Sequence, residues 1–475
     1  MTTVESLSHF APEIVLLVGA VGVLFSDLVF RDKRLIGYSA LGVIVVSLIL
    51  IKALSVSEPL SLFGDFFLLD KLTQLFRVAA LAIVGIAILL SLVYSPLSKL
   101  YMGEYYALLL FSAFGLILMS AATNLLMIFL AIEFVSLISY VLVGFLKADK
   151  FSKEASLKYL LFGSVCSAFM LYGMSLLYGL TGTLKVTEMS TALASAQQPS
   201  LVLTALVMIF AGLGFKISMA PFHMWAPDVY EGAPTPVTAF LTVGPKALGF
   251  VVLIRVLSGA FTPFFDNWTP LILVLSMITM TVGNVIALSQ TNIKRLIAYS
   301  SIAQAGYILM GIATFTDLGI QAVLVYAVVY AFTNLGLFVV VVATSEKVGS
   351  DEIKDYAGLA RRSPLLAGSM LVFFLSLAGI PPLAGFIGKY LVFAAVIKEG
   401  YYVLAVVAAL NSVVAAAYYF KVIKTVYLQP PRDEDALPCP WPLRIALGIT
   451  LAGTILLGVM PNDLIEFVQS ILPLS

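Results

Sequence analysis

The sequence predicts an all-α polytopic membrane protein with about 14 transmembrane helices. Of its 475 residues, 61% are apolar and only 11% are charged, whereas a soluble domain carries about twice that charged fraction. The apolar residues fall in blocks of about 18 or more, long enough to cross a bilayer as helices. The ten-residue alternating patterns of membrane barrel strands are absent.

Charged, proline-rich or glycine-rich segments separate fourteen apolar runs, each of which predicts one membrane crossing. The runs are 11–30, 35–54, 74–94, 105–122, 124–146, 156–180, 200–220, 236–257, 269–289, 297–314, 318–344, 364–397 (long and broken), 401–428 and 443–460. The start of the chain lacks the basic stretch of a signal peptide, so the first run is expected to be retained.

Composition argues against several classes of function. A net charge of +1 gives no reason to expect a nucleic-acid partner. Cys166 and Cys439 form no CxxC, and His9 and His223 are the only histidines, so an iron–sulfur cluster, structural zinc or haem is not expected here. The glycine-rich nucleotide-binding motifs are also absent, so no nucleotide is expected.

Lysine and arginine residues indicate the orientation of the chain. Most of the 27 follow odd-numbered segments, among them Arg31, Arg34, Lys99 and Arg361, and only a few follow even-numbered ones. Cytoplasmic loops are the ones enriched in these residues. We therefore expect both termini to lie on the non-cytoplasmic side.

Four charged residues are assigned to the interior of apolar runs rather than to their ends or to loops, and we expect them to form the functional site. They are Glu133, Lys216, Lys246 and Lys389. A charge at the centre of a membrane helix costs roughly 2.5–3.5 kcal/mol on insertion scales. Such residues normally line a polar interior, and they are often members of proton pathways.

The surroundings of the lysines favour a proton relay. Lys216 and Lys389 both lie in runs interrupted by glycine and proline, 212-GLGFKISMAP-221 and 379-GIPPLAGFIGK-389. Paired, interrupted helices in two halves of a chain indicate a transport site at a repeat interface. Burial disfavours a charged amine and a nearby carboxylate stabilises it, so approach and withdrawal of Glu133 would make Lys216 hold and release a proton. Lys246 would follow in the relay and Lys389 would end it.

Other interpretations of these residues remain open. Lys389 and Lys216 could instead extend their amines to the membrane surface, since each lies near a possible helix end. His223 could exchange protons or serve as an interfacial hydrogen-bonding residue. Lys158 could be a relay member, but a charged helix start is the simpler interpretation. Asp228 and Glu231 are expected to brace a turn, and the tyrosines and methionines to pack.

Long motifs in the sequence resemble the antiporter-like membrane subunits of respiratory complex I and its relatives. They are 216-KISMAPFHMWAPDVYEGAPTPVTAFL-241 and 243-VGPKALGF-250. The segments AIEFVSLISYVLVGF and 154-EASLKYLLFGSVCSAFMLYGMSLLYGLTG-182 are most similar to the N subunit of bacterial NADH:quinone oxidoreductase. A lysine at position 389 argues against the M subunit, and the absence of a long lateral C-terminal helix argues against the L subunit. The resemblance covers about residues 105–430.

The resemblance implies a fold with two inverted five-helix repeats and with helices 7 and 12 broken. The expected division is 1–103 for three N-terminal helices, 104–260 for the first repeat, 261–430 for the second and 431–475 for a C-terminal helix. It implies that Glu133, Lys216, Lys246 and Lys389 form the proton relay. Such a subunit has no redox active site or cofactor of its own. NADH, FMN, iron–sulfur clusters and quinone are expected in partner subunits of the complex. The complex is expected in the bacterial cytoplasmic (inner) membrane. There the partners of this chain would be the other membrane-arm subunits and the bilayer.

Two alternatives differ in function. A subunit of a Mrp-type cation/proton antiporter would share the signature and the buried lysines. A structural subunit with inert ion pairs would also contain buried charges, but one carboxylate cannot pair with three separate amines. The sequence of residues 154–182 favours the complex I subunit over the antiporter subunit.

Overall fold

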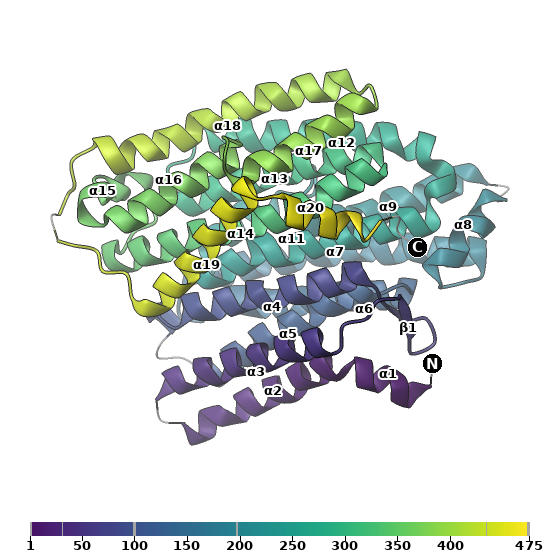
Figure 1. Cartoon of the computed structure of the whole chain (residues 1–475), viewed down its shortest axis with the longest axis horizontal. Coiled ribbons are helices and arrows are strands. Elements are labelled where there is room, and N and C mark those ends of the chain that lie inside the picture. Colours follow the sequence, from purple (N-terminus) through teal and green to yellow (C-terminus); the bar gives the residue numbers. More distant parts are fainter. Residues whose placement is uncertain (1, 31, 98–100, 196–197, 434, 473–475) are drawn as a thin grey trace.

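The computed structural model describes residues 2–30, 32–97, 101–195, 198–433 and 435–472. Within these ranges the molecule consists of helices running side by side, with one short β-hairpin (Figure 1). The all-α membrane fold predicted from the sequence is therefore confirmed. Arg31 and Lys99, which contributed to the predicted orientation, lie outside the described residues.

The helices follow the predicted segments closely. In the described ranges, 13 helices are long and apolar enough to cross a membrane, and α16 with α17 makes a further crossing in two pieces. The elements are α1 (Thr3–His9), α2 (Ala11–Val29), α3 (Lys33–Ala53), β1 (Leu60–Leu62), β2 (Phe67–Leu69), α4 (Lys71–Ser91), η1 (Ser95–Leu97), α5 (Met102–Ala121), α6 (Leu125–Val143), α7 (Lys150–Thr181), α8 (Val186–Ala194), α9 (Pro199–Ile217), α10 (Trp225–Gly232), α11 (Thr235–Ala260), η2 (Thr262–Phe264), α12 (Phe265–Ala287), α13 (Ile293–Thr314), α14 (Asp317–Val348), η3 (Ile353–Tyr356), α15 (Leu359–Arg362), α16 (Pro364–Ala378), α17 (Ala384–Lys398), α18 (Tyr402–Leu428), α19 (Trp441–Val459) and α20 (Asn462–Gln469).

Polar residues in the short loops start several of these helices. The side chains of Asp70, Asn124, Asp149 and Asn292 each accept a hydrogen bond from a backbone N–H in the first turn of α4, α6, α7 and α13. Such caps satisfy donors that have no partner within the helix. They let apolar helices begin sharply at the edge of the membrane.

The seventh and twelfth crossings are broken, as the sequence predicted. Residues 218–224 separate α9 from α10, and residues 379–383 separate α16 from α17. The seventh crossing was predicted as 200–220, but it continues beyond its break through α10 to Gly232. Hydrophobicity alone did not predict this second half of the crossing, because α10 contains the charged residues Asp228 and Glu231.

Two short backbone bridges support the predicted repeat. The N–H of Leu125 donates to the carbonyl of Leu184 at 2.8 Å, and the N–H of Ile293 donates to the carbonyl of Asp351 at 2.8 Å. Each bridge joins the start of the second helix of a proposed repeat to the loop after its third helix. Because an odd number of crossings separates the two loops, the bridges lie at opposite ends of the bundle. The division into repeats itself stays a prediction.

Several small elements were not predicted from hydrophobicity. The hairpin pairs Leu60 with Leu69 and Leu62 with Phe67. The short helices α1, α8 and α20 lie at helix connections or at the ends of the chain. The N and C labels lie toward the same end of the bundle in Figure 1, as an even number of crossings requires.

The N-terminal helices contain a buried ion pair that corrects one sequence prediction. The interior was expected to hold one carboxylate, Glu133, and three amines, and Arg77 was not among them. Instead, Glu13 of α2 is 0% exposed and Arg77 of α4 is 2% exposed, and their charged atoms are 2.7 Å apart. Lys294 at the start of α13 is also buried. These residues lie near helix ends, where sequence alone cannot separate a buried charge from a solvated one.

We predict that removing one partner of the buried pair destabilises the fold more than removing both. Glu13→Ala leaves the Arg77 guanidinium buried without its carboxylate, which costs about 3–5 kcal/mol. The double variant Glu13→Leu/Arg77→Met leaves no charge to bury and should recover most of that loss. Thermal unfolding of the full chain in detergent measures both. Equal midpoints for the single and double variants would contradict the prediction.

Candidate functional site

Glu133 and Lys216 lie on neighbouring elements but do not form an ion pair. Lys216, in the last turn of α9, is 1% exposed, and its Nζ donates to Ser136 Oγ of α6 at 2.8 Å. Glu133 precedes Ser136 by one turn of α6, is partly buried, and accepts a hydrogen bond from Ser167 of α7 at 2.5 Å. A hydroxyl therefore occupies the position next to the amine, while the carboxylate is held by another helix.

Helix α9 ends just after Lys216, at the break in the seventh crossing. Ser218 adopts a left-handed conformation with φ 59°. The N–H of Ala220 donates to Thr279 Oγ1 of α12 at 3.0 Å, and Trp225 Nε1 donates to the carbonyl of Phe215 at 3.1 Å. Side chains thus satisfy backbone groups that the interrupted helix leaves free. Lys216 lies at the helix C-terminus, where the helix dipole favours a cation.

Lys246 lies inside α11, next to a proline. It is 3% exposed, and its Nζ donates to Ser301 Oγ of α13 at 2.7 Å and lies 5.4 Å from the centre of the Tyr230 ring. Pro245 has no N–H to bond the carbonyl of Leu241, and that carbonyl accepts the Tyr230 hydroxyl at 3.3 Å instead. The proline therefore helps to place an aromatic face beside the amine.

Lys389 is bound by the broken end of a neighbouring helix. Its Nζ donates to the carbonyl of Ala378, the last residue of α16, at 3.0 Å, and to Ser412 Oγ of α18 at 3.5 Å. It also lies 4.6 Å from the centre of the Tyr307 ring. The last carbonyls of a helix lack intrahelical donors and form the negative end of its dipole. Since Lys389 is only 6% exposed, its amine does not extend to the surface of this chain.

A series of buried polar side chains lies between Lys246 and Lys389. Ser300, next to Ser301, shares a hydrogen bond of 2.5 Å with the Tyr419 hydroxyl, and Tyr419 packs against Tyr418. The contacts continue from Tyr418 to Asn284 at 3.0 Å, from Asn284 to Tyr307 at 3.3 Å, and from Ser412 to Tyr307 at 3.2 Å. With Ser412 in reach of Lys389, α11, α12, α13, α17 and α18 meet in one polar region.

The sequence interpretation missed this series because it assigned tyrosines to packing. Tyr159 does pack, stacked on Trp225 with ring centres 4.3 Å apart. Tyr307, Tyr418 and Tyr419 instead use their hydroxyls inside the bundle. A signal was present, because serine, asparagine and glutamine recur within the apolar runs of α12, α13 and α18.

His223 and Lys158 occupy different settings. His223 lies in the break after α9, is 8% exposed, and its Nδ1 has no hydrogen-bond partner among the described residues. Lys158 is partly exposed near the start of α7, where it pairs with Glu154 at 2.9 Å and with Asp228 at 2.6 Å. Those carboxylates place it in a surface cluster, apart from the hydroxyl-bound amines.

Asp228 and Glu231, which were expected to brace a turn, lie on the short helix α10. Both carboxylates accept hydrogen bonds from Arg295 of α13, at 2.8 and 2.7 Å. Lys294 donates to the carbonyls of Glu231 and Ala233 at 2.7 and 2.9 Å. These contacts fasten the end of α10 to α13.

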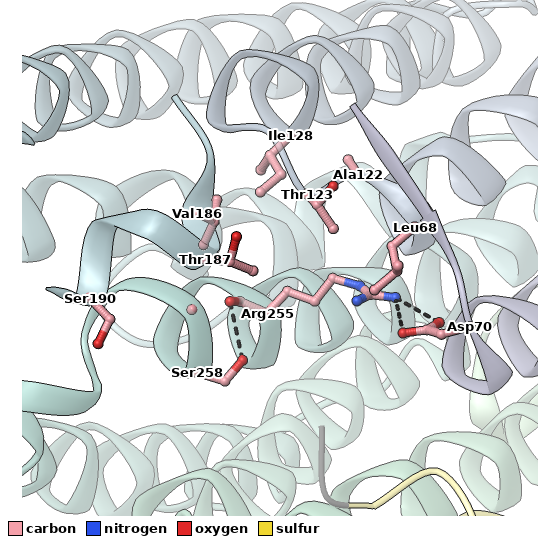
Figure 2. A pocket seen from close by; sticks show the side chains of 11 residues that line it. Leu68, Asp70, Ala122, Thr123, Ile128, Val186, Thr187, Ser190, Arg255 and Ser258 are labelled. Carbon is pink, nitrogen blue, oxygen red and sulfur yellow. Dashed lines mark hydrogen bonds and ion pairs between the residues drawn. The ribbon is translucent and has the colours of Figure 1, made fainter. Parts of the chain in front are cut away.

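A separate pocket of about 230 Å³ lies at the hairpin end of the bundle (Figure 2). Arg255 of α11 contacts both carboxylate oxygens of Asp70 at 3.0 Å and donates from Nε to the carbonyl of Ser120 at 2.8 Å. Close by, hydrogen bonds from Ser61 and Lys185 hold the pKa of the Asp65 carboxyl below its ordinary value. The pocket is separated from Lys246 by the apolar stretch 247–254 of α11, so it does not join the lysine region.

The described residues contain no group of three or more His, Cys, Asp or Glu side chains placed to hold a metal ion. The buried polar atoms of the lysine region are amines, hydroxyls and amides. This donor set suits proton exchange, because a hydroxyl both donates and accepts.

Comparison with known proteins now decides the family. The sequence model of the family described as NADH:quinone oxidoreductase/Mrp antiporter, TM matches residues 122–415, more than half of the chain. The chain belongs to this family. The match contains Glu133, Lys216, Lys246 and Lys389.

Individual members of the NADH:quinone oxidoreductase/Mrp antiporter family match nearly the whole chain. NADH-quinone oxidoreductase subunit N of Trichlorobacter lovleyi is 40% identical over 472 residues, covering 98% of this chain and 96% of that protein. A chain of respiratory complex I from Thermus thermophilus with bound aureothin is 32% identical with a TM-score of 0.82, covering 96% and 98%. A chain of the Mrp complex from Dietzia sp. has a TM-score of 0.85 at 21% identity, covering 99% and 97%, which is a likeness of fold alone. The predicted resemblance to the N subunit is confirmed.

We predict that Gly379 holds Lys389 in place. Gly379 has a φ of +85°, and a Cβ there would lie 2.7 Å from Lys389 Cδ. Gly379→Ala should destabilise the chain by at least about 1–2 kcal/mol, the cost of a left-handed conformation with a side chain. Gly368→Ala is the matched control, because that glycine is helical and a Cβ meets nothing within 4 Å. It should be neutral or stabilising by up to about 1 kcal/mol. Thermal unfolding in detergent measures both, and equal effects would contradict the assignment.

Proposed function

We propose that this chain is a proton-translocating membrane-arm subunit of a bacterial NADH:quinone oxidoreductase. The observation that carries the proposal is the set of three buried amines, Lys216, Lys246 and Lys389, each bound by uncharged oxygen atoms. The names and near-complete coverage of the 40%-identical relatives support the same assignment.

The proposed mechanism depends on how the amines are bound. A carboxylate within bonding distance would favour the charged lysine at all times. A serine hydroxyl stabilises an ammonium group less strongly than a carboxylate does. The same hydroxyl can also accept a hydrogen bond from the neutral amine or donate one to it. Lys216 and Lys246 have such partners, so both protonation states can be accommodated. We assign them to the first and second positions of the relay and Lys389 to the last.

Glu133 is proposed to control the first step. Its carboxylate is bound to Ser167 of α7, while Lys216 is bound to Ser136, one turn of α6 away. A small rearrangement between α6, α7 and α9 would bring the carboxylate to the amine and favour the protonated form. Separation would return Lys216 to Ser136 and favour release of the proton toward Lys246.

The energy for this movement is proposed to come from other subunits. Moving one charge against 100 mV costs about 2.3 kcal/mol. We assign no redox site or cofactor to this chain, and we place NADH, FMN, iron–sulfur clusters and quinone in partner subunits. Contacts with neighbouring membrane-arm subunits would transmit the redox energy to the Glu133–Lys216 pair. The location proposed is the bacterial cytoplasmic membrane, with both termini on the non-cytoplasmic side.

We predict that Lys216→Ala and Glu133→Ala leave the assembled complex intact but lower both its activities. NADH:quinone electron transfer and proton uptake into vesicles should each fall at least about tenfold, because loss of a proton-transfer group commonly costs more than this. Lys424→Ala, an exposed lysine on α18, is the matched control and should retain both activities. Unchanged rates in an assembled Lys216→Ala complex would refute the relay.

We further predict a role for the tyrosine hydroxyl nearest Lys389. Tyr307→Phe removes the group that contacts Asn284 and Ser412 but keeps the ring beside Lys389. Proton uptake should fall severalfold, consistent with the loss of one proton-transfer group. Tyr356→Phe is the control, since its buried hydroxyl contacts Ser345 outside the lysine region. If the two variants pump equally well, the hydroxyl series is not part of the route.

A further inference from the structure

A second cavity lies far from the lysine region, at the end of the bundle where α3 begins. It has a volume of about 580 Å³ and is enclosed by the first turns of α3, α5 and α19 and by the residues that end α4. Arg34, Tyr38, Tyr106 and Trp441 are among its lining residues. The elements come from both ends of the sequence, so only the folded chain forms this cavity.

One residue that lines the cavity has a buried polar atom without a protein partner. Tyr106 of α5 is 0% exposed, yet its hydroxyl has no hydrogen-bond partner among the described residues. Its tip lies against Gly37 of α3, where a Cβ would be 2.9 Å from the hydroxyl oxygen. Buried hydroxyls are normally hydrogen-bonded because an unmet bond costs free energy. The hydroxyl is not exposed in the free chain, so a ligand with an oxygen acceptor would complete this site only after the wall moves to admit it.

The charged groups at the mouth include one guanidinium for such a ligand, beside the Asp32 carboxylate, which also takes part in no ion pair among the described residues. Lys33 pairs with Asp27 at 2.6 Å, and the Asp32 side chain caps α3 by accepting the backbone N–H of Arg34. The Arg34 side chain is exposed and takes part in no ion pair among the described residues. A guanidinium recognises phosphate oxygens well, because its planar donors match their geometry.

Two aromatic rings mark the depth of the cavity in the membrane. Tyr38 of α3 and Trp441 of α19 stack with ring centres 5.8 Å apart and an interplanar angle of 26°. They are 36% and 51% exposed. Tyrosine and tryptophan collect at the boundary between hydrocarbon and headgroups. The cavity therefore opens at headgroup level.

Exposed apolar stripes lead from this aromatic pair into the membrane. Along α3, Gly42, Val45 and Ile49 follow Tyr38 at helical spacing, and all three are exposed. Along α19, Ile445 and Ile449 follow Trp441 in the same way, at 47% and 46% exposure. Both helices pack on α4. A ligand for this place would have a polar anionic head and long apolar chains.

We propose that the cavity binds one anionic diacyl phospholipid. Its phosphate lies against the Arg34 guanidinium, and the wall moves on binding so that the Tyr106 hydroxyl donates to a phosphate oxygen. Its glycerol region lies beside the Tyr38–Trp441 pair, and its acyl chains follow the two stripes. Basic pockets between membrane helices hold lipid headgroups by this combination of charge and burial. The bound lipid would fill the space between the N-terminal helices and α19.

Trp441 provides a direct test. The chain has three tryptophans, and the other two, Trp225 and Trp268, are 2% and 1% exposed. The full-length chain is reconstituted in phosphatidylcholine vesicles containing rising fractions of phosphatidylglycerol brominated near the headgroup, which quenches tryptophan fluorescence on contact. Brominated phosphatidylcholine is the reference lipid, and Trp441→Phe gives the background. We expect half-maximal quenching at about fivefold lower mole fraction of phosphatidylglycerol, the preference given by one basic residue near a membrane surface.

Variants separate the site from general surface charge. Arg34→Ala should abolish the preference, and Tyr106→Phe should weaken it while keeping the ring. Lys424→Ala, which removes an exposed cation elsewhere, should retain it. Gel filtration and circular dichroism establish that each variant is folded. Equal quenching by the two lipids, a preference that survives Arg34→Ala, or one that is lost equally in Lys424→Ala would overturn the proposal. Relief of quenching by millimolar inorganic phosphate would assign the site to a free anion and would also overturn it.

Discussion

An ammonium group inside a membrane needs polar neighbours, and much of this fold can be understood from that requirement. Lys216, Lys246 and Lys389 are each less than a tenth exposed, and each reaches an oxygen atom on another helix. Those partners come from α6, α13 and α16. The helices are therefore fixed relative to one another by polar contacts in regions where hydrophobic burial against lipid provides little specificity.

The chain binds its buried charges in two chemically different ways. Arg77 and Arg255 are paired with the carboxylates of Glu13 and Asp70, and these pairs join elements distant in sequence. A close carboxylate favours one protonation state, which suits a structural contact. The three central lysines have hydroxyl or carbonyl partners instead. This difference separates charge pairs that favour one protonation state from amines suited to exchanging protons.

Irregular backbone is confined to places where side chains can compensate for it. At the break before α10, the side chains of Thr279 and Trp225 form hydrogen bonds with backbone groups. At the end of α16, the side chain of Lys389 does the same. At Pro245 the freed carbonyl of Leu241 meets the Tyr230 hydroxyl. In a low-dielectric interior an unpaired backbone group is expensive, so non-helical backbone persists only where protein or water satisfies it. Breaks and buried amines consequently occur together.

The sequence by itself determined the membrane class, the crossings and the four central charged residues. Hydropathy shows these directly, because a charge within a long apolar run has no solvated position available along its helix. The burial of Glu13 and Arg77 was not predicted, because these residues lie near helix ends, where most charges are solvated. Only the tertiary structure decided that Lys216 contacts Ser136 rather than Glu133, and that Tyr307, Tyr418 and Asn284 meet between Lys246 and Lys389. Hydroxyl and amide side chains are tolerated at many positions in apolar helices. Their hydrogen-bond partners depend on which surfaces of the helices pack together. That choice is made by packing across the whole bundle, which no local stretch of sequence encodes.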